Sequence, residues 1–310
     1  MTRDDTMSEA RQRLFIIANP RIGRGKRADL LQICQLLYEG GAEVEMVISA
    51  RRGEGAELAR KAVDSGLFDA VIAAGGDGTV HDVARGLLGS EVPLGIVPLG
   101  TANVLAREIG MKPTPAMVAR TLLFGPARAI RVGMANDEPF LFVVGVGFDA
   151  AAVRHFETGG YRRLGMGGLA PPVLRALAEG RKWPLSVELD GATHEAHWVI
   201  VTRVPRYAAN ILLCEDASLF SDTLCVVLFR GGRRARLRQL AALFTGLLPH
   251  DPGVSILHAR HIRITGPADT PVQMDGESIG HLPLSLTTGE DRLRLIFGNR
   301  PLTRPTPARA

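Results

Sequence analysis

The sequence lacks several features that define large classes of protein. It has only three cysteines in 310 residues, Cys34, Cys214 and Cys225, and their spacing matches neither a metal-binding motif nor a disulfide-rich scaffold. Its longest apolar runs, such as residues 140–148, are far shorter than the roughly 20 residues of a membrane span. Residues 1–20 contain early acids and lack the apolar stretch of a signal peptide. These absences predict a cytoplasmic protein without a disulfide framework or a transmembrane segment.

Aromatic residues are also scarce, at 5%, and the densest basic run, Arg230 to Arg238, contains none for base stacking. The formal net charge of +5 would otherwise suit either nucleic acid or an anionic lipid surface. We therefore expect no nucleic-acid partner and favour peripheral association with an anionic membrane, with oligomerisation left open. Burial against the protein's own sheet is the more common use of an amphipathic stripe, and it is the alternative for the apolar residues that accompany the run. These are Leu237, Leu240, Ala241, Phe244, Leu247 and Leu248.

The order of segments predicts two domains. Residues 1–126 alternate strand-like and helix-like segments, which predicts an α/β domain with an open parallel sheet. Residues 127–300 contain many strand-length runs separated by turn residues, which predicts a β-sandwich. Two helical insertions are expected there, near Pro171 to Gly180 and after Arg233. The Pro- and Arg-rich tail, residues 301–310, is expected to be disordered.

Three loops in the first domain follow predicted strands and carry glycine or polar turns. They are NPRIGRGK at residues 19–26, GGDGT at 75–79 and PLGTANVLA at 98–106. Because the carboxyl ends of parallel strands converge on one crevice, these loops predict a single nucleotide site. Glycine lets backbone amides approach a phosphate closely, and the N-terminus of the following helix adds partial positive charge.

Asp77 is unexpected in such a loop, because a carboxylate repels phosphate oxygens unless a cation or a reacting hydroxyl lies beside it. We expect it to organise the loop and the magnesium of Mg-ATP. The alternative is a helix N-cap, since aspartate is a common residue at that position.

The ordered set of NPRIGRGK, GGDGTVHDVARGL, GIVPLGTANVLAREIG, GVGFDA and DGE resembles the diacylglycerol kinase catalytic family, which includes bacterial soluble lipid kinases and sphingosine and ceramide kinases. The resemblance covers residues 12 to 300. It implies an ATP- and Mg²⁺-dependent lipid kinase with a cleft between a phosphofructokinase-like nucleotide domain and a β-sandwich lipid domain. By position, it implies that the nucleotide is bound by Asn19, Arg24, Gly25, Ser49, Gly76, Gly78, Thr79, Thr101, Asn103 and Glu277.

Phosphoryl transfer to a lipid hydroxyl needs a general base. Asp275 of the DGE motif and Asp77 are the two candidate catalytic acids, and we assign the role of base to Asp275. The alternative for Asp275 is a plain hairpin residue, since Asp-Gly is a strong turn signal. The resemblance also implies a structural magnesium site, for which Asp216 and Asp222 are the candidate ligands. Two departures bear on these expectations: Val104 stands where many bacterial relatives carry an acid, and CEDASLFSDTL replaces the usual magnesium loop.

Two other functions remain open. The GGDGT loop is shared with NAD kinases, so a small-molecule kinase is one alternative, and Val104 motivates a second, a non-catalytic lipid or nucleotide sensor. Two histidines, His258 and His261, could ligate a metal, but without a third ligand they are more typical of surface polar residues.

Overall fold

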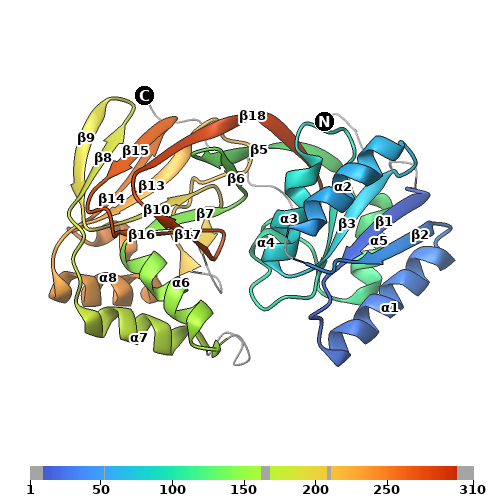
Figure 1. Ribbon diagram of the computed structural model, residues 1–310, viewed down its shortest axis with the longest axis horizontal. Coiled ribbons are helices and arrows are strands. Elements are labelled where there is room, and N and C mark those ends of the chain that lie inside the picture. Colours follow the sequence, from blue (N-terminus) through green and yellow to red (C-terminus); the bar gives the residue numbers. More distant parts are fainter. Residues whose placement is uncertain (1–9, 52, 162–167, 208–210, 299–310) are drawn as a thin grey trace, which may run out of the picture. The chain divides into compact units, whose positions relative to one another are not determined.

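The computed structural model describes residues 10–51, 53–161, 168–207 and 211–298 (Figure 1). The tail that we expected to be disordered, residues 301–310, lies outside these ranges. Contacts divide the chain into two units. Unit 1 contains the described residues up to Ile130 and those from Asp291 onward, and unit 2 contains Arg131–Glu290. The predicted division after residue 126 does not include the return of the chain to unit 1 at Asp291.

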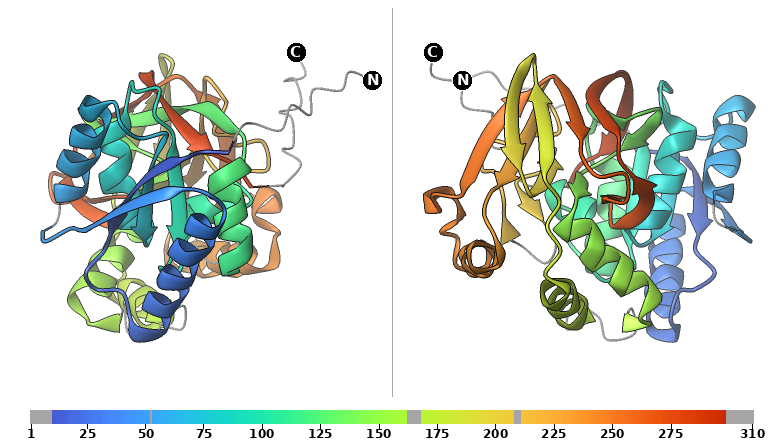
Figure 2. Two further views of the ribbon diagram at one scale, coloured as in Figure 1. Left: turned by 90° about the vertical axis from the view of Figure 1, so that its right-hand side faces the viewer. Right: turned by 60° about the vertical axis from the view of Figure 1, so that its left-hand side comes forward.

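Unit 1 is built on a parallel sheet with the strand order β2-β1-β3-β4. The strands are β1 (Arg13–Ala18), β2 (Glu43–Ile48), β3 (Ala70–Gly75) and β4 (Leu94–Pro98). The helices are α1 (Arg24–Glu39), α2 (Glu54–Ser65), α3 (Asp77–Leu87), α4 (Val104–Glu108) and α5 (Pro115–Phe124). Helices α2 and α3 pack together on one face of the sheet and α1 and α5 on the other (Figure 2), as right-handed crossovers in this strand order require.

The composition of β3 follows from its position in the sheet. All six of its residues are buried, which explains why the strand reads as a continuous apolar run rather than an alternating one. Close packing also explains Gly86 on α3, because a Cβ atom there would lie 2.3 Å from the Ala56 carbonyl oxygen of α2. The sequence prediction of an open parallel α/β domain is confirmed.

Unit 2 contains two antiparallel sheets, as predicted for a β-sandwich. One has the order β14-β13-β10-β7-β16-β17, and its strands are β14 (Val254–Ala259), β13 (Leu224–Phe229), β10 (Trp198–Thr202), β7 (Val143–Val146), β16 (Pro271–Met274) and β17 (Glu277–His281). The other contains β18 (Leu284–Ile296), β15 (His261–Thr265), β8 (Leu185–Leu189), β9 (Ala192–Ala196), β5 (Ala127–Ala135) and β6 (Glu138–Phe140). A short pair, β11 (Arg206–Tyr207) and β12 (Ile211–Leu212), stands apart from both sheets.

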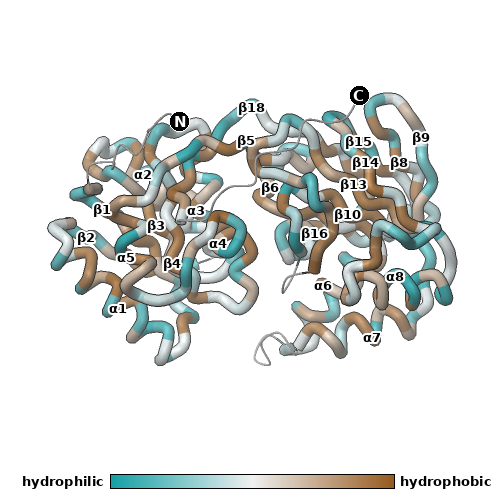
Figure 3. Tube along the Cα trace, turned by 180° about the vertical axis from the view of Figure 1, so that it is seen from behind, coloured by the Kyte–Doolittle hydropathy of each residue, from teal (hydrophilic) through white to brown (hydrophobic). Residues whose placement is uncertain are grey.

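The core of unit 2 centres on β10 and β13, every residue of which is buried, and both strands are apolar in Figure 3. The rings of Trp198 and Phe229 stack there with centroids 3.8 Å apart. The two expected helical insertions are present as α7 (Ala170–Glu179) and α8 (Arg233–Thr245), and they are joined by α6 (Phe148–Thr158) and a short helix at Leu248–His250.

Two strands cross the boundary between the units. Strand β5 begins in unit 1 and continues into unit 2, and β18 begins in unit 2 and ends in unit 1. Near its start β18 pairs with β15, and near its end Leu295 pairs with Leu94 of β4. Strand β18 therefore joins the parallel strands β1–β4 and the antiparallel strands β15, β8 and β9 into one hydrogen-bonded sheet.

The apolar stripe after the basic run is not buried against the protein's own sheet. Leu237 is 49% exposed, Phe244 74% and Leu247 57%, and Leu248 is the member of the stripe that is fully buried. Helix α8 instead buries Arg236, Gln239, Ala242 and Leu243. Among the described residues, no helix combines the length and apolar character needed to cross a bilayer.

The expectation of no disulfide framework did not include the single disulfide bond that the structure contains. Cys214 and Cys225 form a disulfide bond, whereas Cys34 is a free, half-buried thiol. The two bonded cysteines are 11 residues apart in the sequence, and β13 returns the chain past the loop that carries Cys214. A spacing of this length has no characteristic motif, which is why sequence inspection missed the pair.

Candidate active site

The three glycine and polar loops predicted to converge do meet at the carboxyl end of the sheet in unit 1. After β1, the Asn19 backbone N–H donates to the Ala74 carbonyl at 3.0 Å, and its side-chain amide donates to Thr79 Oγ1 at 2.9 Å. After β4, the Leu99 N–H donates to the Gly75 carbonyl at 2.9 Å. These bonds join the first loop to the second and the second to the third, within one unit.

Asp77 connects the second loop to the third. It is the first residue of α3, and the N-cap position before it is Gly76. Its Oδ1 accepts the backbone N–H of Val104 at 2.7 Å, where α4 begins. The N-cap alternative therefore does not describe the position of Asp77 in the helix. The donor is the backbone N–H of residue 104, so this hydrogen bond does not depend on whether the side chain there is valine or an acid.

The second glycine turn is shaped by Asn103. This residue has a left-handed backbone, with φ +47°, and its side chain accepts the Gly100 N–H at 2.9 Å and donates to the Gly100 carbonyl at 3.0 Å. A Cβ atom on Gly100 would lie 2.5 Å from the Cα of Gly76, so neither loop has room for a side chain between them. The two backbones form a tight cradle beside the N-terminus of α3, which suits an anion.

The other predicted nucleotide residues of unit 1 lie around this edge. Arg24 and Gly25 open α1 and are exposed, and a Cβ atom on Gly25 would meet no other atom within 4 Å. Ser49 follows β2, and its N–H donates to the Ala18 carbonyl at 3.0 Å. Gly78 lies in the first turn of α3, and Thr101 is exposed at the tip of the third loop.

Asp275 occupies a two-residue hairpin turn in unit 2. It lies between β16 and β17 with φ +50°, followed by Gly276 with φ +86°, which is the geometry that Asp-Gly turns favour. Its carboxylate is 6% exposed and accepts three backbone N–H groups. Their donors are Leu141 at 2.7 Å, Phe142 at 3.0 Å and Val143 at 2.9 Å. The turn alternative thus describes the backbone, and the role of Asp275 as a base stays a prediction, as does a nucleotide contact from the half-buried Glu277 next to it.

The loop expected to hold a structural magnesium ion is contacted by guanidinium groups. Asp222 forms an ion pair with Arg131, with Nε to Oδ1 at 2.8 Å. Arg203, which is 1% exposed, donates to the carbonyls of Leu219 at 3.0 Å and Ser221 at 3.3 Å. Burial lowers the pKa of Arg203 to about 10.

Magnesium prefers carboxylate and carbonyl oxygens as ligands. In this loop such oxygens instead accept hydrogen bonds or form ion pairs with arginine side chains. The other candidate ligand, Asp216, is exposed. The residues present do not fit a structural magnesium ion.

A buried polar network next to the Asp275 turn was missed from the sequence. Asp149, in the first turn of α6, accepts the Tyr207 hydroxyl at 2.7 Å and the Gln273 side-chain amide at 2.7 Å. Gln273 in turn accepts the Gly276 N–H at 2.9 Å, so the network ends on the turn itself. Burial raises the pKa of Asp149, and the two hydrogen bonds oppose that shift. The signal was the acid in GVGFDA, which lies at the start of a helix shortly after the apolar strand β7.

The comparisons with known proteins agree with this arrangement. Residues 13–135 match the family described as diacylglycerol kinase catalytic domain, and residues 142–297 match the YegS C-terminal NAD kinase beta sandwich-like domain. A Bacillus subtilis protein named diacylglycerol kinase is 26% identical over 279 residues, which cover 88% of this chain and 92% of the relative. The Synechocystis protein sll0036 is 27% identical over 224 residues, or 70% of this chain, and the match spans about half (52%) of its length.

A solved structure shows the same fold. The crystal structure of a diacylglycerol kinase from Bacillus anthracis superimposes with a TM-score of 0.69 at 18% identity, covering 93% of this chain and 98% of that one. The two family matches together account for nearly all the described residues, in the order that the sequence motifs predicted. The chain therefore belongs to the diacylglycerol kinase catalytic family and is a kinase of the lipid kinase type.

Proposed function

We propose that this protein transfers the γ-phosphate of ATP to a hydroxyl group of a membrane lipid such as diacylglycerol. The observation that carries the proposal is the convergence of three loops on one edge of the sheet, where glycine backbones and a helix N-terminus offer amide groups to an anion. The name of the Bacillus subtilis relative supports the class of acceptor.

The residues of this edge have complementary tasks in the proposal. The Gly76 and Gly100 backbones would lie against the phosphates, because their close approach excludes side chains. Asp77 would hold the Mg²⁺ ion that accompanies ATP, and this ion supplies charge neutralisation on the phosphate oxygens. The bond from Val104 fixes the direction of the Asp77 carboxylate.

Asp275 is the base in this proposal. A lipid hydroxyl becomes a better nucleophile as its proton moves to a positioned carboxylate. The acceptor oxygen forms a bond to the γ-phosphorus, the bond from that phosphorus to the bridging oxygen breaks, ADP leaves, and the hydroxyl proton goes to Asp275. The three N–H groups that hold this carboxylate fix its orientation.

Helix α8 supports the proposed peripheral contact with an anionic membrane. Its buried side includes Arg236, whose guanidinium donates to the Arg181 carbonyl at 2.8 Å, while Phe244 and Leu237 are exposed. Exposed apolar side chains next to the exposed arginines 233 and 234 suit contact with an anionic lipid surface, whereas Arg238 is paired with Asp251. We propose that α8 docks on an anionic bilayer.

A direct assay tests the reaction. Purified protein is incubated with γ-labelled ATP, Mg²⁺ and a total lipid extract, and labelled products are identified by mass spectrometry. We expect a lipid phosphate. Transfer to NAD in a parallel reaction without lipid would instead indicate a small-molecule kinase, and nucleotide binding without transfer to any acceptor would indicate a sensor.

Vesicle sedimentation tests the membrane contact. Removing Phe244 from the interface forfeits about 1.5–3 kcal/mol of apolar transfer free energy, so Phe244→Ser should weaken binding to anionic vesicles by roughly 10- to 100-fold. Tyr38→Ser is the matched control, because Tyr38 on α1 is 73% exposed. Equal losses in the two variants, or equal binding to neutral and anionic vesicles at low salt, would contradict a docking role for α8.

A further inference from the structure

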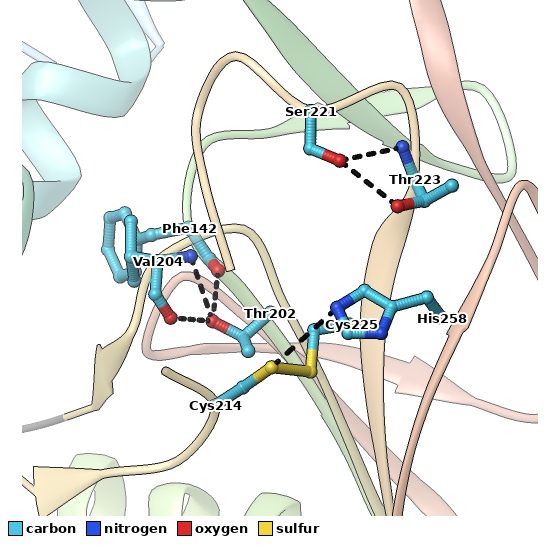
Figure 4. The surroundings of a disulfide bond; sticks show 8 residues. All are labelled: Phe142, Thr202, Val204, Cys214, Ser221, Thr223, Cys225 and His258. Carbon is cyan, nitrogen blue, oxygen red and sulfur yellow. Dashed lines mark hydrogen bonds between the residues drawn. A yellow bond between two sulfur atoms is a disulfide. The ribbon is translucent and has the colours of Figure 1, made fainter. Parts of the chain in front are cut away.

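The disulfide in unit 2 has a histidine directly beside it. Cys225 on β13 pairs in register with His258 on β14, the edge strand of its sheet. The His258 Nε2 atom lies 3.9 Å from Cys214 Sγ, and the possible ligand atoms of the three residues all lie within 4.8 Å of one another (Figure 4). Three residues from three separate segments of the chain thus present two sulfur atoms and one imidazole nitrogen at a single point.

The cluster is buried on its sulfur side and open on its histidine side. Cys214 is 2% exposed and Cys225 1%, whereas His258 is exposed. The nearby Thr202 hydroxyl is engaged by the Phe142 and Val204 carbonyls, so it is not part of the donor set. A ligand or a small reductant can therefore approach along the imidazole, while the protein closes the other side.

We propose that Cys214, Cys225 and His258 bind one Zn²⁺ ion when the disulfide is reduced. Two thiolates and one imidazole are a common zinc donor set, and three protein ligands leave a fourth position open to water. A tetrahedral zinc ion with bonds of about 2.3 Å to sulfur and about 2.0–2.1 Å to nitrogen places its ligands roughly 3.6–3.8 Å apart. The His258 Nε2 atom lies 3.9 Å from Cys214 Sγ, close to that distance, and the two bonded sulfur atoms must separate when zinc binds.

The chemistry balances with a dithiol as the reductant. The dithiol gives two electrons and two protons to the disulfide, which becomes two thiols, and it becomes a disulfide itself. Zinc then displaces the two thiol protons and binds the thiolates. Either the covalent bond or the metal would close the 214–225 loop, which also receives the Arg203 hydrogen bonds.

Zinc titration of the intact chain tests the proposal. A Cys34→Ser background removes the remaining thiol, and the protein is titrated with ZnCl₂ against a chromophoric chelator, both oxidised and after reduction by a dithiol that is then removed. We expect one equivalent of zinc in the reduced protein and none in the oxidised protein. Cobalt(II) should give the intense thiolate charge-transfer absorption of a tetrahedral site in the reduced protein alone.

Two histidine variants keep the test sharp even if cysteine variants fold poorly. His258 is exposed, so His258→Ala should preserve the fold while weakening zinc binding at least tenfold. His261→Ala is the matched control, because His261 is an exposed histidine on the next strand, β15. Absence of zinc uptake by the reduced protein, or undiminished affinity in His258→Ala, would overturn the proposal and leave the cysteines as a disulfide only.

Discussion

Replacing Asp275 by asparagine separates its two proposed tasks, anchoring the hairpin turn and accepting a proton. The carboxylate receives three backbone N–H groups, two on Oδ1 and one, from Leu141, on Oδ2. An asparagine keeps one oxygen for Phe142 and Val143 but turns an amide N–H group toward the Leu141 N–H. The variant therefore loses one charge-assisted bond, weakens two others and leaves a buried donor without an acceptor.

The structural part of the loss can be estimated from these bonds. A hydrogen bond to a charged group contributes about 1.5–3 kcal/mol, and an unsatisfied buried donor costs about 1–3 kcal/mol. Since these terms overlap, we expect Asp275→Asn to lower the free energy of unfolding by about 2–5 kcal/mol. For a unit of the size of residues 131–290, this corresponds to a fall in Tm of roughly 5–15 °C. The catalytic part, from the lost base, is a fall in kcat of roughly 10²–10⁴.

The assay measures Tm, ATP affinity and kcat at a temperature where the variant is fully folded. Asp190→Asn is the control, because Asp190 also has a positive φ in an Asp-Gly hairpin of unit 2, and its carboxylate accepts the Arg260 and His261 N–H groups in an exposed setting. We expect the control to keep its kcat. A folded Asp275→Asn enzyme with wild-type kcat would refute the base assignment, and an unchanged Tm would refute the anchoring role.

Four further substitutions test other parts of the structure. Asp77→Asn can keep the bond to the third loop through its amide oxygen, so it should weaken Mg-ATP binding in calorimetry together with turnover; normal binding would reverse its assigned role. Gly86→Ala should destabilise the protein by about 1–3 kcal/mol in urea, because its Cβ would press on the Ala56 carbonyl, and a wild-type midpoint would contradict this packing. Burial raises the pKa of Asp149 in the folded protein above its unfolded value of about 4. The protonated carboxyl therefore contributes stability that is fully present below about pH 4 and is lost as the pH rises through the pKa of the folded state. Asp149→Asn should therefore gain stability relative to the wild type as the pH rises from about 4 to 7, and a pH-independent difference would contradict the shift. Arg203→Met should speed hydrogen exchange in the 214–225 loop, because two carbonyls lose their donor, and unchanged exchange would show that the arginine does not hold the loop.

The parts of the molecule governed by local rules were predictable from the sequence. The buried run of β3 and the glycines after it predicted strand, turn and helix, and the parallel order of the strands brought the three loops together as expected. Asp275-Gly276 was also recognisable as a hairpin, because only a few residue pairs accept positive φ at two successive positions.

Features that depend on long-range packing were not predictable. The Cys214–Cys225 bond requires that β13 return past the earlier loop, and no spacing rule encodes this return. The hydrogen bond from Val104 to Asp77 uses a backbone group, so the side chain at that position conveys nothing about it. Helix α8 has apolar residues at the expected spacing, but the pattern cannot tell which face turns inward, and the protein buries Arg236 and Gln239.

Strand β18 has a consequence for how the chain folds during synthesis. Unit 1 begins near the N-terminus, yet β4 pairs with Leu295, and the backbones of Phe297 and Gly298 bond to Pro126 and Ile109. The ribosome must therefore make all of unit 2 before unit 1 is complete, so vectorial folding of the first unit stops with one sheet edge unpaired. An exposed edge of this kind is a template for pairing with other chains. Translation that stalls before residue 291 should consequently yield nascent chains that require a chaperone to stay unaggregated.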